Sequence, residues 1–174
     1  MILESDRLIL RPLAESDAAA IMALDADPRV IRHTKAGLDG AAADPAAMLA
    51  RALAHRRARP GFGFWAAEMR ADGAFIGWFH LLAAAEGEAE LGFRLRHAVW
   101  GRGYATEGAR ALIEHAFDTL GVARVSASAL AANPASIRVM EKVGLRLAKR
   151  FVHPPDHPAV LYALERSTKE RPRS

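Results

Sequence analysis

The chain has 174 residues, 51% hydrophobic and 25% charged, a balance that is typical of one globular domain with a substantial core. It contains no cysteine, which excludes a disulfide framework, a thiolate metal site and a cysteine nucleophile. The net charge of +4 favours an anionic ligand or RNA, but we find no aromatic–basic motif of the kind that RNA-binding platforms use. Because no long apolar run opens or interrupts the chain, we expect neither a signal peptide nor a membrane span.

The first third of the chain predicts one short strand followed by helices. The expected elements are a strand over 7–11, a helix from 16–17 to 27–28, a loop or broken helix over 29–45, and a helix from 44–45 to 60–61. The first helix should begin at Ser16 and Asp17, because these residues are good N-caps. The next helix should begin where Asp44 can cap and Pro45 can take the first helical position.

The middle of the chain predicts an antiparallel meander, because glycine-containing turns separate its strand-like runs. The strands are expected over residues 62–69, 74–82 and 89–95, with turns at 71–73 and 86–88. The last of these strands leads directly into the most informative stretch of the sequence.

In the stretch from Leu91 to Thr106, a strand breaks at Gly101 and Gly103 and opens into a helix. The first N–H groups of a helix lack partners within it, and its dipole adds positive charge, so this turn predicts a phosphate site. The two glycines let the backbone approach an anion closely, and Arg102 adds a cation. An ordinary strand-to-helix loop with two glycines explains this segment equally well.

The last third predicts helices that alternate with strands. The expected elements are a helix from 105 to 120 capped by Gly121, a strand over 124–130, a helix from Asn133 to Gly144, and strands over 146–152 and 159–165. Together the elements predict a single α/β (α+β) domain over residues 1–166, with a mixed sheet, an antiparallel N-terminal meander and β-α-β crossovers in the C-terminal half. Residues 167–174 are expected to form a disordered basic tail.

Two motifs of this chain are informative when they are taken together. The first is Trp-Gly-Arg-Gly-Tyr-Ala-Thr-Glu at residues 100–107, and the second is Asn-Pro-Ala-Ser-Ile-Arg-Val-Met-Glu-Lys-Val-Gly-Leu at residues 133–145. They resemble the GNAT superfamily of N-acetyltransferases, in particular the branch of ribosomal-protein N-terminal (Rim-type) acetyltransferases. Residues 5–13 also resemble the opening strand of that branch. The resemblance covers residues 3–165 and implies a GNAT-like domain that uses acetyl-CoA as a cosubstrate.

The resemblance also implies where acetyl-CoA binds. The family's pyrophosphate loop is glutamine or arginine, two residues, glycine, one residue, then glycine or alanine. Gly103 and Ala105 match this pattern, whereas Trp100 stands at its first position. The main-chain N–H groups expected to hold the pyrophosphate are those of Gly101, Arg102, Gly103, Tyr104, Ala105 and Thr106. The pantetheine arm is expected to bind main-chain atoms of Phe93, Arg94 and Leu95 and to contact Asn133.

Direct acetyl transfer requires a base for the substrate ammonium and stabilisation of the departing thiolate. Many family members place a general-acid tyrosine seven residues after the asparagine. This chain has Met140 there, and its only two tyrosines are Tyr104 and Tyr162. Ser136 is therefore the hydroxyl expected to hydrogen-bond the CoA sulfur, with support of the helix start as the alternative role.

Glu90, on the strand that leads to the cofactor loop, is the expected general base, acting directly or through water. An exposed strand carboxylate without a catalytic role explains its position as well. Glu88 has the same side-chain parity but lies nearer the turn, and His80 lies on the preceding strand. A water without a single protein base is a further possibility.

We therefore expect an acetyl-CoA-dependent N-acetyltransferase whose acceptor is a primary amine, either a protein N-terminus or a small molecule. The alternative class is a non-catalytic acyl-CoA-binding module of the same fold, which the missing tyrosine favours. We expect a cytoplasmic protein with no metal, no membrane contact and no nucleic-acid partner, and we leave a homodimer open. Acceptor specificity should come from the helical region around residues 25–60 and from the C-terminal strands, where no motif is readable.

Overall fold

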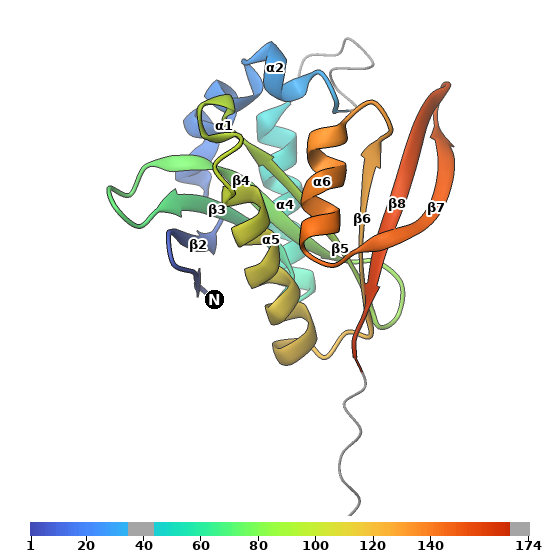
Figure 1. Cartoon of the computed structure of the whole chain (residues 1–174). Helices are drawn as coiled ribbons and strands as arrows, with labels where there is room; N and C mark the ends of the chain where they lie inside the picture. The colour runs from blue at the N-terminus through green and yellow to red at the C-terminus, as the bar shows by residue number, and fades with distance from the viewer. Residues whose placement is uncertain (35–43, 168–174) are drawn as a thin grey trace, which may run out of the picture.

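A computed structural model describes residues 1–34 and 44–167, which form a mixed sheet with helices on both faces (Figure 1). Its strands are β1 (Leu3–Glu4), β2 (Leu8–Pro12), β3 (Gly63–Met69), β4 (Phe75–Ala83), β5 (Glu88–Leu95), β6 (Arg124–Leu130), β7 (Arg146–His153) and β8 (His157–Glu165). Its α-helices are α1 (Ala18–Asp25), α2 (Pro28–Ile31), α4 (Pro45–Ala58), α5 (Tyr104–Glu114) and α6 (Pro134–Lys142). Shorter helical turns are η1 (Glu15–Asp17), η2 (His97–Val99) and η3 (His115–Thr119).

The strands of the described residues form one sheet in the order β1-β2-β3-β4-β5-β6-β8-β7. Neighbouring strands are antiparallel except β5 and β6, which are parallel because α5 returns the chain across the sheet between them. Strands β6 and β7 also share one direction, since each is antiparallel to β8, and α6 connects them. The predicted fold class, an antiparallel meander followed by β-α-β crossovers, is confirmed.

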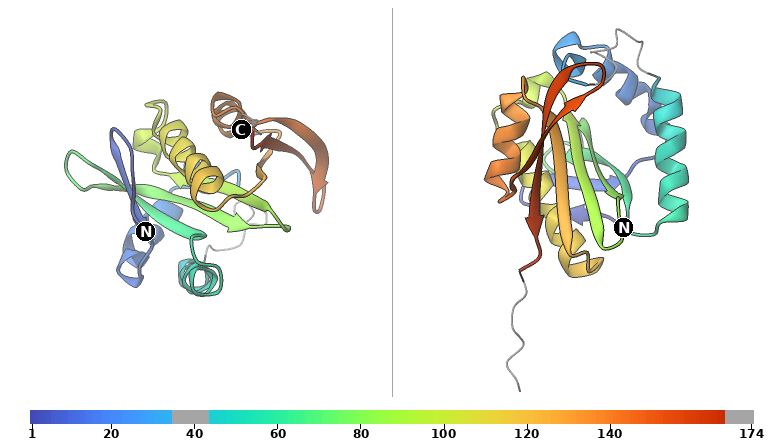
Figure 2. Two further views of the ribbon diagram at one scale, coloured as in Figure 1. Left: turned by 90° about the horizontal axis from the view of Figure 1, so that it is seen from below. Right: turned by 90° about the vertical axis from the view of Figure 1, so that its right-hand side faces the viewer.

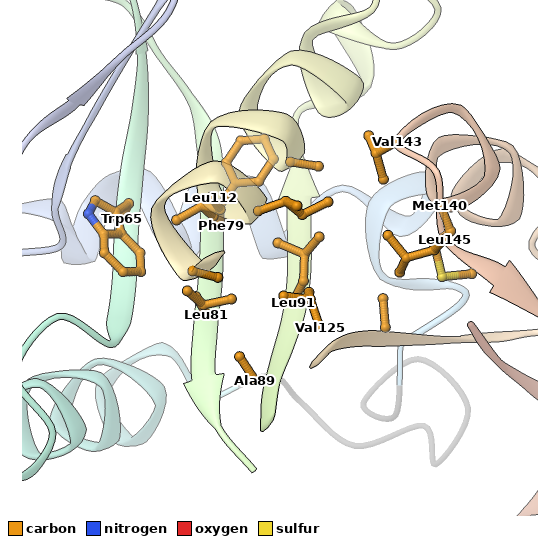
Figure 3. Close-up of a cluster of buried hydrophobic side chains, with 14 of the residues drawn as sticks. Trp65, Phe79, Leu81, Ala89, Leu91, Leu112, Val125, Met140, Val143 and Leu145 are labelled. Atoms are coloured by element: carbon orange, nitrogen blue, oxygen red, sulfur yellow. The ribbon is translucent and has the colours of Figure 1, made fainter. Parts of the chain in front are cut away.

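The helices divide between the two faces of the sheet. Helices α5 and α6 lie over one face, and α1 and α4 lie over the other (Figure 2). The apolar cluster under α5 and α6 includes Phe79, Leu91 and Leu112 (Figure 3). A second cluster under α1 and α4 includes Leu49 and Trp78. Burial on both faces explains why the central strands are apolar on both sides instead of alternating with polar residues.

Helix α5 packs unusually close to β4, and a glycine makes this possible. A Cβ atom added to Gly108 would lie 2.3 Å from Cζ of Phe79, whose side chain is fully buried. No real Cβ contact is that short, so the ring occupies the space that any side chain at this position would need. The position of α5 over the sheet therefore depends on the absence of a side chain at Gly108.

The predicted helices and strands are confirmed within the described residues, with ends that shift slightly. Strand β8 begins at His157 instead of residue 159, and β5 begins at Glu88 instead of residue 89. The region predicted as loop or broken helix contains α2, which Asp27 caps by accepting the N–H of Arg29 at 3.0 Å. Residues 35–43 of that region, and residues 168–174 of the predicted tail, lie outside the described part of the chain.

The predicted cap of α1 needs a correction. Asp17 occupies the N-cap position, but its carboxylate makes no hydrogen bond to that helix. It accepts the N–H of Ala14 at 2.8 Å and pairs with Arg11 at 2.6 Å. Burial acts to raise the pKa of Asp17, but the hydrogen bonds from Arg11 and Ala14 hold this pKa below its usual value. The carboxylate was available for capping by sequence, but the half-buried guanidinium of Arg11 is the stronger partner.

The helix predicted to run to residue 120 also differs from a regular α-helix. Its last part, η3, is a π turn, in which the N–H of Leu120 donates to the carbonyl of His115 at 3.1 Å. Nε2 of His115 lies 2.8 Å from the carbonyl oxygen of Gly61. Periodicity could not reveal this change, because Phe117 and Leu120 still pack against the core. Gly121 ends the element with φ of 68°, as predicted for a C-terminal cap.

We predict that Gly108→Val destabilises the protein by about 1–3 kcal/mol, the usual cost of forcing an extra group into a packed core. The Phe79 ring must move or α5 must lift away from β4. Urea unfolding measures the change, and Glu114→Val, at an exposed position of the same helix, is the control for helix propensity. An unchanged midpoint for Gly108→Val would contradict the close packing.

Candidate active site

The sheet opens between β5 and β6, its parallel pair. Their register consists of Glu88 with Arg124, Ala89 with Val125, and Glu90 with Ser126, and it ends there. Beyond this point β5 continues beside β4, and β6 continues beside β8. The two strands therefore part toward their carboxyl ends, which leaves a gap in the sheet.

Two contacts identify which main-chain groups of β5 face the β6 side. Oγ of Ser126 lies 3.5 Å from the carbonyl oxygen of Ala89. Farther along, Nε1 of Trp100 donates to the carbonyl of Leu95 at 2.8 Å. These carbonyls belong to alternate residues of one strand, so they mark one edge of it.

The same alternation assigns the polar main-chain groups within the gap. Those of Leu91 and Phe93 point to the β6 side, at positions where β5 no longer pairs with β6. Arg94 lies in the other phase, with its main-chain groups toward β4 and its side chain paired with Asp25 at 2.6 Å. A narrow ligand that entered the gap could thus hydrogen-bond to Phe93 as an added strand would.

Helix α5 begins beside this gap without a side-chain cap. Its N-cap is Gly103, in the left-handed region with φ of 85°, and no side-chain hydrogen bond caps the helix. The first-turn N–H groups and the positive end of the helix dipole are therefore available to an anion. The carboxyl ends of β5 and β6 and the N-terminal ends of α5 and α6 all lie at the same edge of the sheet (Figure 1).

Trp100, at the position where the family pattern has glutamine or arginine, has a structural contact. Besides its bond to Leu95, its ring lies 4.9 Å from that of His97, between centroids. The indole therefore braces the loop against the end of β5 while remaining 38% exposed. Arg102, by contrast, is exposed at the loop.

Helix α6 begins with the predicted asparagine cap. Oδ1 of Asn133 accepts the main-chain N–H of Ser136 at 3.1 Å, and Pro134 takes the first helical position. The cap thus uses only the main chain of Ser136, and no hydrogen bond within the described residues involves its hydroxyl. The amide NH2 of Asn133 and the hydroxyl of Ser136 remain available to a ligand.

Glu90 lies at the last parallel pair, where the strands begin to part. Its side chain is exposed and points to the α1/α4 face, because Ala89 and Leu91 belong to the core on the α5 face. Glu88 shares this face, but it contacts Arg124 at 3.3 Å. Of the two carboxylates, Glu90 is the one at the gap and without an ion-pair partner among the described residues.

His80 lies one strand further from the gap, with both ring nitrogens buried and without a hydrogen-bond partner in the described part of the chain. The ring stacks on Trp78 at 5.9 Å and meets Phe64 edge-on at 5.2 Å. It also covers Gly92, where an added Cβ would collide with it. Burial lowers the pKa of His80 to about 4, and the charge of Arg94 acts in the same direction. The ring is therefore neutral at pH 7 and closed to substrate.

Neither tyrosine stands at the position where many family members have a general-acid tyrosine. Met140 is 2% exposed and belongs to the core (Figure 3). The hydroxyl of Tyr162 donates to Oε1 of Glu141 at 3.1 Å. The ring of Tyr104 lies under the guanidinium of Arg7, 4.4 Å from its centroid.

A cluster of residues that sequence reasoning missed ties the N-terminus to the glycine loop. Glu107, in the first turn of α5, accepts hydrogen bonds from the hydroxyl of Ser5 and from the main chain and side chain of Arg7, each at 2.7 Å. Arg7 also donates to the carbonyl of Arg102 at 3.0 Å. One guanidinium thus holds both the loop and the helix start. The partners are 100 residues apart, so no local pattern indicated the contact.

No group of three or more histidine, aspartate or glutamate side chains in residues 1–34 and 44–167 could hold a metal ion. None of the helices in the same ranges is long and apolar enough to cross a membrane.

We predict that Glu107→Gln lowers the free energy of unfolding by about 1–2 kcal/mol at pH 7, because charge-assisted hydrogen bonds to Arg7 are lost and Arg7 is partly exposed. Although burial acts to raise it, the bonds from Ser5 and Arg7 hold the pKa of Glu107 below its usual value. Because the pKa of Glu107 is lower in the folded state, its contribution to stability is complete above the pKa of the unfolded state. The contribution is lost as the pH falls through the pKa of the folded state.

Urea unfolding at several pH values measures this difference. The difference in free energy of unfolding between the wild type and Glu107→Gln should therefore be largest near neutral pH and should disappear in acid. Glu114→Gln, exposed on the same helix, is the matched control and should have little effect. A difference in stability that stays constant down to pH about 2 would contradict the role of the ionised carboxylate.

Comparisons with known proteins agree on the family. Residues 7–146 match the family described as "Acetyltransferase (GNAT) domain". The chain is 33% identical over 165 residues to the "FsC-acetyl coenzyme A-N(2)-transacetylase" of Aspergillus fumigatus, which covers 90% of this chain and 69% of that protein. It is also 33% identical over 149 residues to the "Uncharacterized N-acetyltransferase YoaA" of Bacillus subtilis, covering 83% of this chain and 82% of that one.

A solved structure of RimL, described as a ribosomal alpha-N-protein acetyltransferase in complex with coenzyme A, has the same fold. The TM-score is 0.79, with 95% of this chain and 98% of that chain covered, at 16% identity. The predicted superfamily is confirmed, and the Rim-type branch is represented among the structural neighbours. The match over residues 7–146, together with the identity to a named N-acetyltransferase, shows that this chain belongs to the GNAT family of acetyltransferases.

Proposed function

We propose that this enzyme transfers the acetyl group of acetyl-CoA to a primary amine by direct attack of the amine on the thioester. The observation that carries the proposal is the parting of β5 and β6 directly beside the uncapped N-terminus of α5. A gap lined by free main-chain groups suits an extended amide-containing arm, and the helix start suits a pyrophosphate. GNAT domains use acetyl-CoA, so the family agrees with this chemistry.

The residues present fit acetyl-CoA at each part of the molecule. The pyrophosphate would lie against the main-chain N–H groups of Gly101, Arg102, Gly103, Tyr104, Ala105 and Thr106. The nearest carboxylate of the helix, Glu107, is neutralised by its pair with Arg7, so it leaves the dipole of α5 free to attract an anion.

The pantetheine arm would bind along β5 and reach α6. Phe93 supplies the main-chain groups that face the gap, and Leu95 shares its carbonyl with Trp100. Arg94 would contribute to cofactor binding through its side chain instead of its main chain. Its pair with Asp25 holds that side chain beside the strand. The free amide NH2 of Asn133 can donate to a carbonyl of the arm.

We propose Glu90 as the general base. It takes the proton that the ammonium loses on becoming a nucleophile, directly or through one water. Its exposure and its place where the strands part give it access to an amine that enters from the α1/α4 face. Glu88 and His80 are weaker candidates, because Glu88 pairs with Arg124 and the ring nitrogens of His80 are buried.

We propose that Ser136 steadies the leaving thiolate. As the thioester bond breaks, sulfur gains negative charge, and a hydroxyl in the first turn of α6 can donate to it. With Met140 in the core, no tyrosine hydroxyl competes for this role at that position.

The acceptor is an amine of a protein N-terminus or of a small molecule, and the names of the relatives agree with transfer to nitrogen. The Aspergillus relative is named for N(2)-transacetylation, and the RimL structure is described as that of an alpha-N-protein acetyltransferase. A non-catalytic acyl-CoA-binding module is the second candidate, and buried Met140 in place of a tyrosine is the observation that favours it.

We predict that Glu90→Gln leaves CoA affinity nearly intact and lowers turnover by roughly 10²–10⁴-fold, the usual contribution of a general base. The measurement is release of free thiol from acetyl-CoA with an active amine. The control is His80→Phe, which should retain turnover if His80 only fills the core. Undiminished turnover of Glu90→Gln would move the role to Glu88, His80 or water.

We predict that Ser136→Ala lowers turnover and the specificity constant together, by roughly 10- to 150-fold, because the lost hydrogen bond strengthens only in the transition state. The apparent affinity for the amine should hardly change. If Ser136 supports only the start of α6, the variant instead loses up to about 1 kcal/mol of stability and keeps its turnover. A lower melting temperature with unchanged turnover would remove Ser136 from the catalytic residues.

A further inference from the structure

A small cavity lies at the carboxyl end of β6, on the far side of the gap from β5. Its volume is about 200 Å³. Its lining comes from the segment after α2 and from β6, β7 and β8, and consists of His33, Ser128, Ala129, Leu130, Phe151, His153 and Ala159. These elements meet only in the folded chain, so no local pattern predicted this site.

The cavity is on the same face of the sheet as Glu90. Ser126 pairs directly with Glu90, and Ser128 lies two residues further along β6 with its side chain in the same direction. At about 3.3 Å per residue, the cavity therefore begins roughly 7 Å along β6 beyond the pair of Glu90 with Ser126, and it extends to roughly 13 Å beyond that pair at Leu130. An acceptor with its amine at Glu90 could place a second group in the cavity.

The lining specifies what that group should be. His33, His153 and Ser128 can donate hydrogen bonds, Phe151 and Leu130 form an apolar wall, and no carboxylate belongs to the lining. Arg32 is next to His33, and its positive charge acts on that ring. Burial and the charge of Arg32 lower the pKa of His33, which favours a neutral ring with one N–H donor. A bound anion would act in the opposite direction and favour the protonated ring, which has two N–H donors.

Resting on the proposed function, we infer that this cavity binds a carboxylate of the acceptor, so that the substrate is a primary amine with a carboxylate several bonds away. A second ammonium group would meet hydrogen-bond donors and the nearby charge of Arg32 here, which disfavours polyamines. The volume is smaller than that of a whole small-molecule site, so it suits the carboxylate end of the acceptor alone. The carboxylate can belong to a free amino acid that reacts through an amine at the far end of its side chain, or to an acidic side chain near a protein N-terminus.

Free-thiol release with matched amines tests the inference. The small acceptors are 6-aminohexanoate, its amide, 1,6-diaminohexane and glycine, whose carboxylate is too close to its amine to reach the cavity. The peptide acceptors are a pair that differ only by Glu or Gln as the second residue. We expect kcat/KM to be about 10- to 100-fold higher for the acid of a pair than for its amide, and lowest for the diamine. The pair with the larger preference identifies the source of the carboxylate.

Variants of the lining tie the preference to the cavity. His33→Ala, His153→Ala and Ser128→Ala should each reduce the acid-to-amide ratio, because kcat/KM for the acid falls more than kcat/KM for its amide. Val152→Ala is the matched control, because Val152 lies between Phe151 and His153 on β7 but is 62% exposed. Melting temperature and CoA affinity of each variant confirm that it is folded, and the three separate positions guard against failure of one.

The outcomes separate this inference from the proposed function. Acetyl transfer with equal rates for acid and amide, or a preference that all three variants retain, would overturn the inference and leave the function intact. No thiol release with any amine would overturn the function itself.

Discussion

The parting of β5 from β6 is the constraint on which the rest of this structure depends. A sheet normally satisfies the N–H and C=O groups of adjacent strands by pairing them, yet here the pairing ends at Glu90 and Ser126. The groups of Leu91 and Phe93 are left for a ligand that can form strand-like hydrogen bonds. Because the connection through α5 makes the pair parallel, both strands open toward the edge at which α5 and α6 begin. One topological feature therefore brings an arm-binding gap and an anion-binding helix start together.

Packing and electrostatics hold this arrangement in place from two sides. Gly108 allows α5 to lie directly on Phe79, so the helix cannot tilt away from the sheet without opening the core. One residue earlier in α5, Glu107 pairs with Arg7 and thereby joins the N-terminal segment to the start of the helix and to the carbonyl of Arg102. The loop that should hold a pyrophosphate is thus fixed by side chains that need not touch it. On the opposite face, the buried ring of His80 supports β5 through Gly92 and takes no part in proton transfer in this account.

Local signals in the sequence were sufficient for most of the fold, including the glycine turn before α5 and the asparagine cap of α6. Glycine turns, apolar periodicity and the cap at Asn133 predicted the elements, because each signal acts over a few residues. The contact of Arg7 with Glu107 could not be predicted, since a pairing over 100 residues leaves no local pattern. Asp17 was correctly placed at the N-cap of α1, but the bond of its carboxylate could not be predicted, because a pairing with Arg11 six residues earlier is not a capping pattern. The cavity with His33 and His153 likewise depends on elements that only the fold brings together.

Calorimetric titration of CoA into the folded chain tests the central claim most directly, with Gly103→Val and Gly73→Val as a matched pair. Both glycines have positive φ, 85° and 70°, so either substitution strains the backbone, but Gly73 lies in the hairpin between β3 and β4. We expect micromolar binding by the wild type and by Gly73→Val, and no binding by Gly103→Val, whose distorted loop cannot direct its N–H groups to the pyrophosphate. A folded wild type that binds no CoA, or a Gly103→Val variant that binds as tightly as the wild type, would contradict the site described for this acetyltransferase.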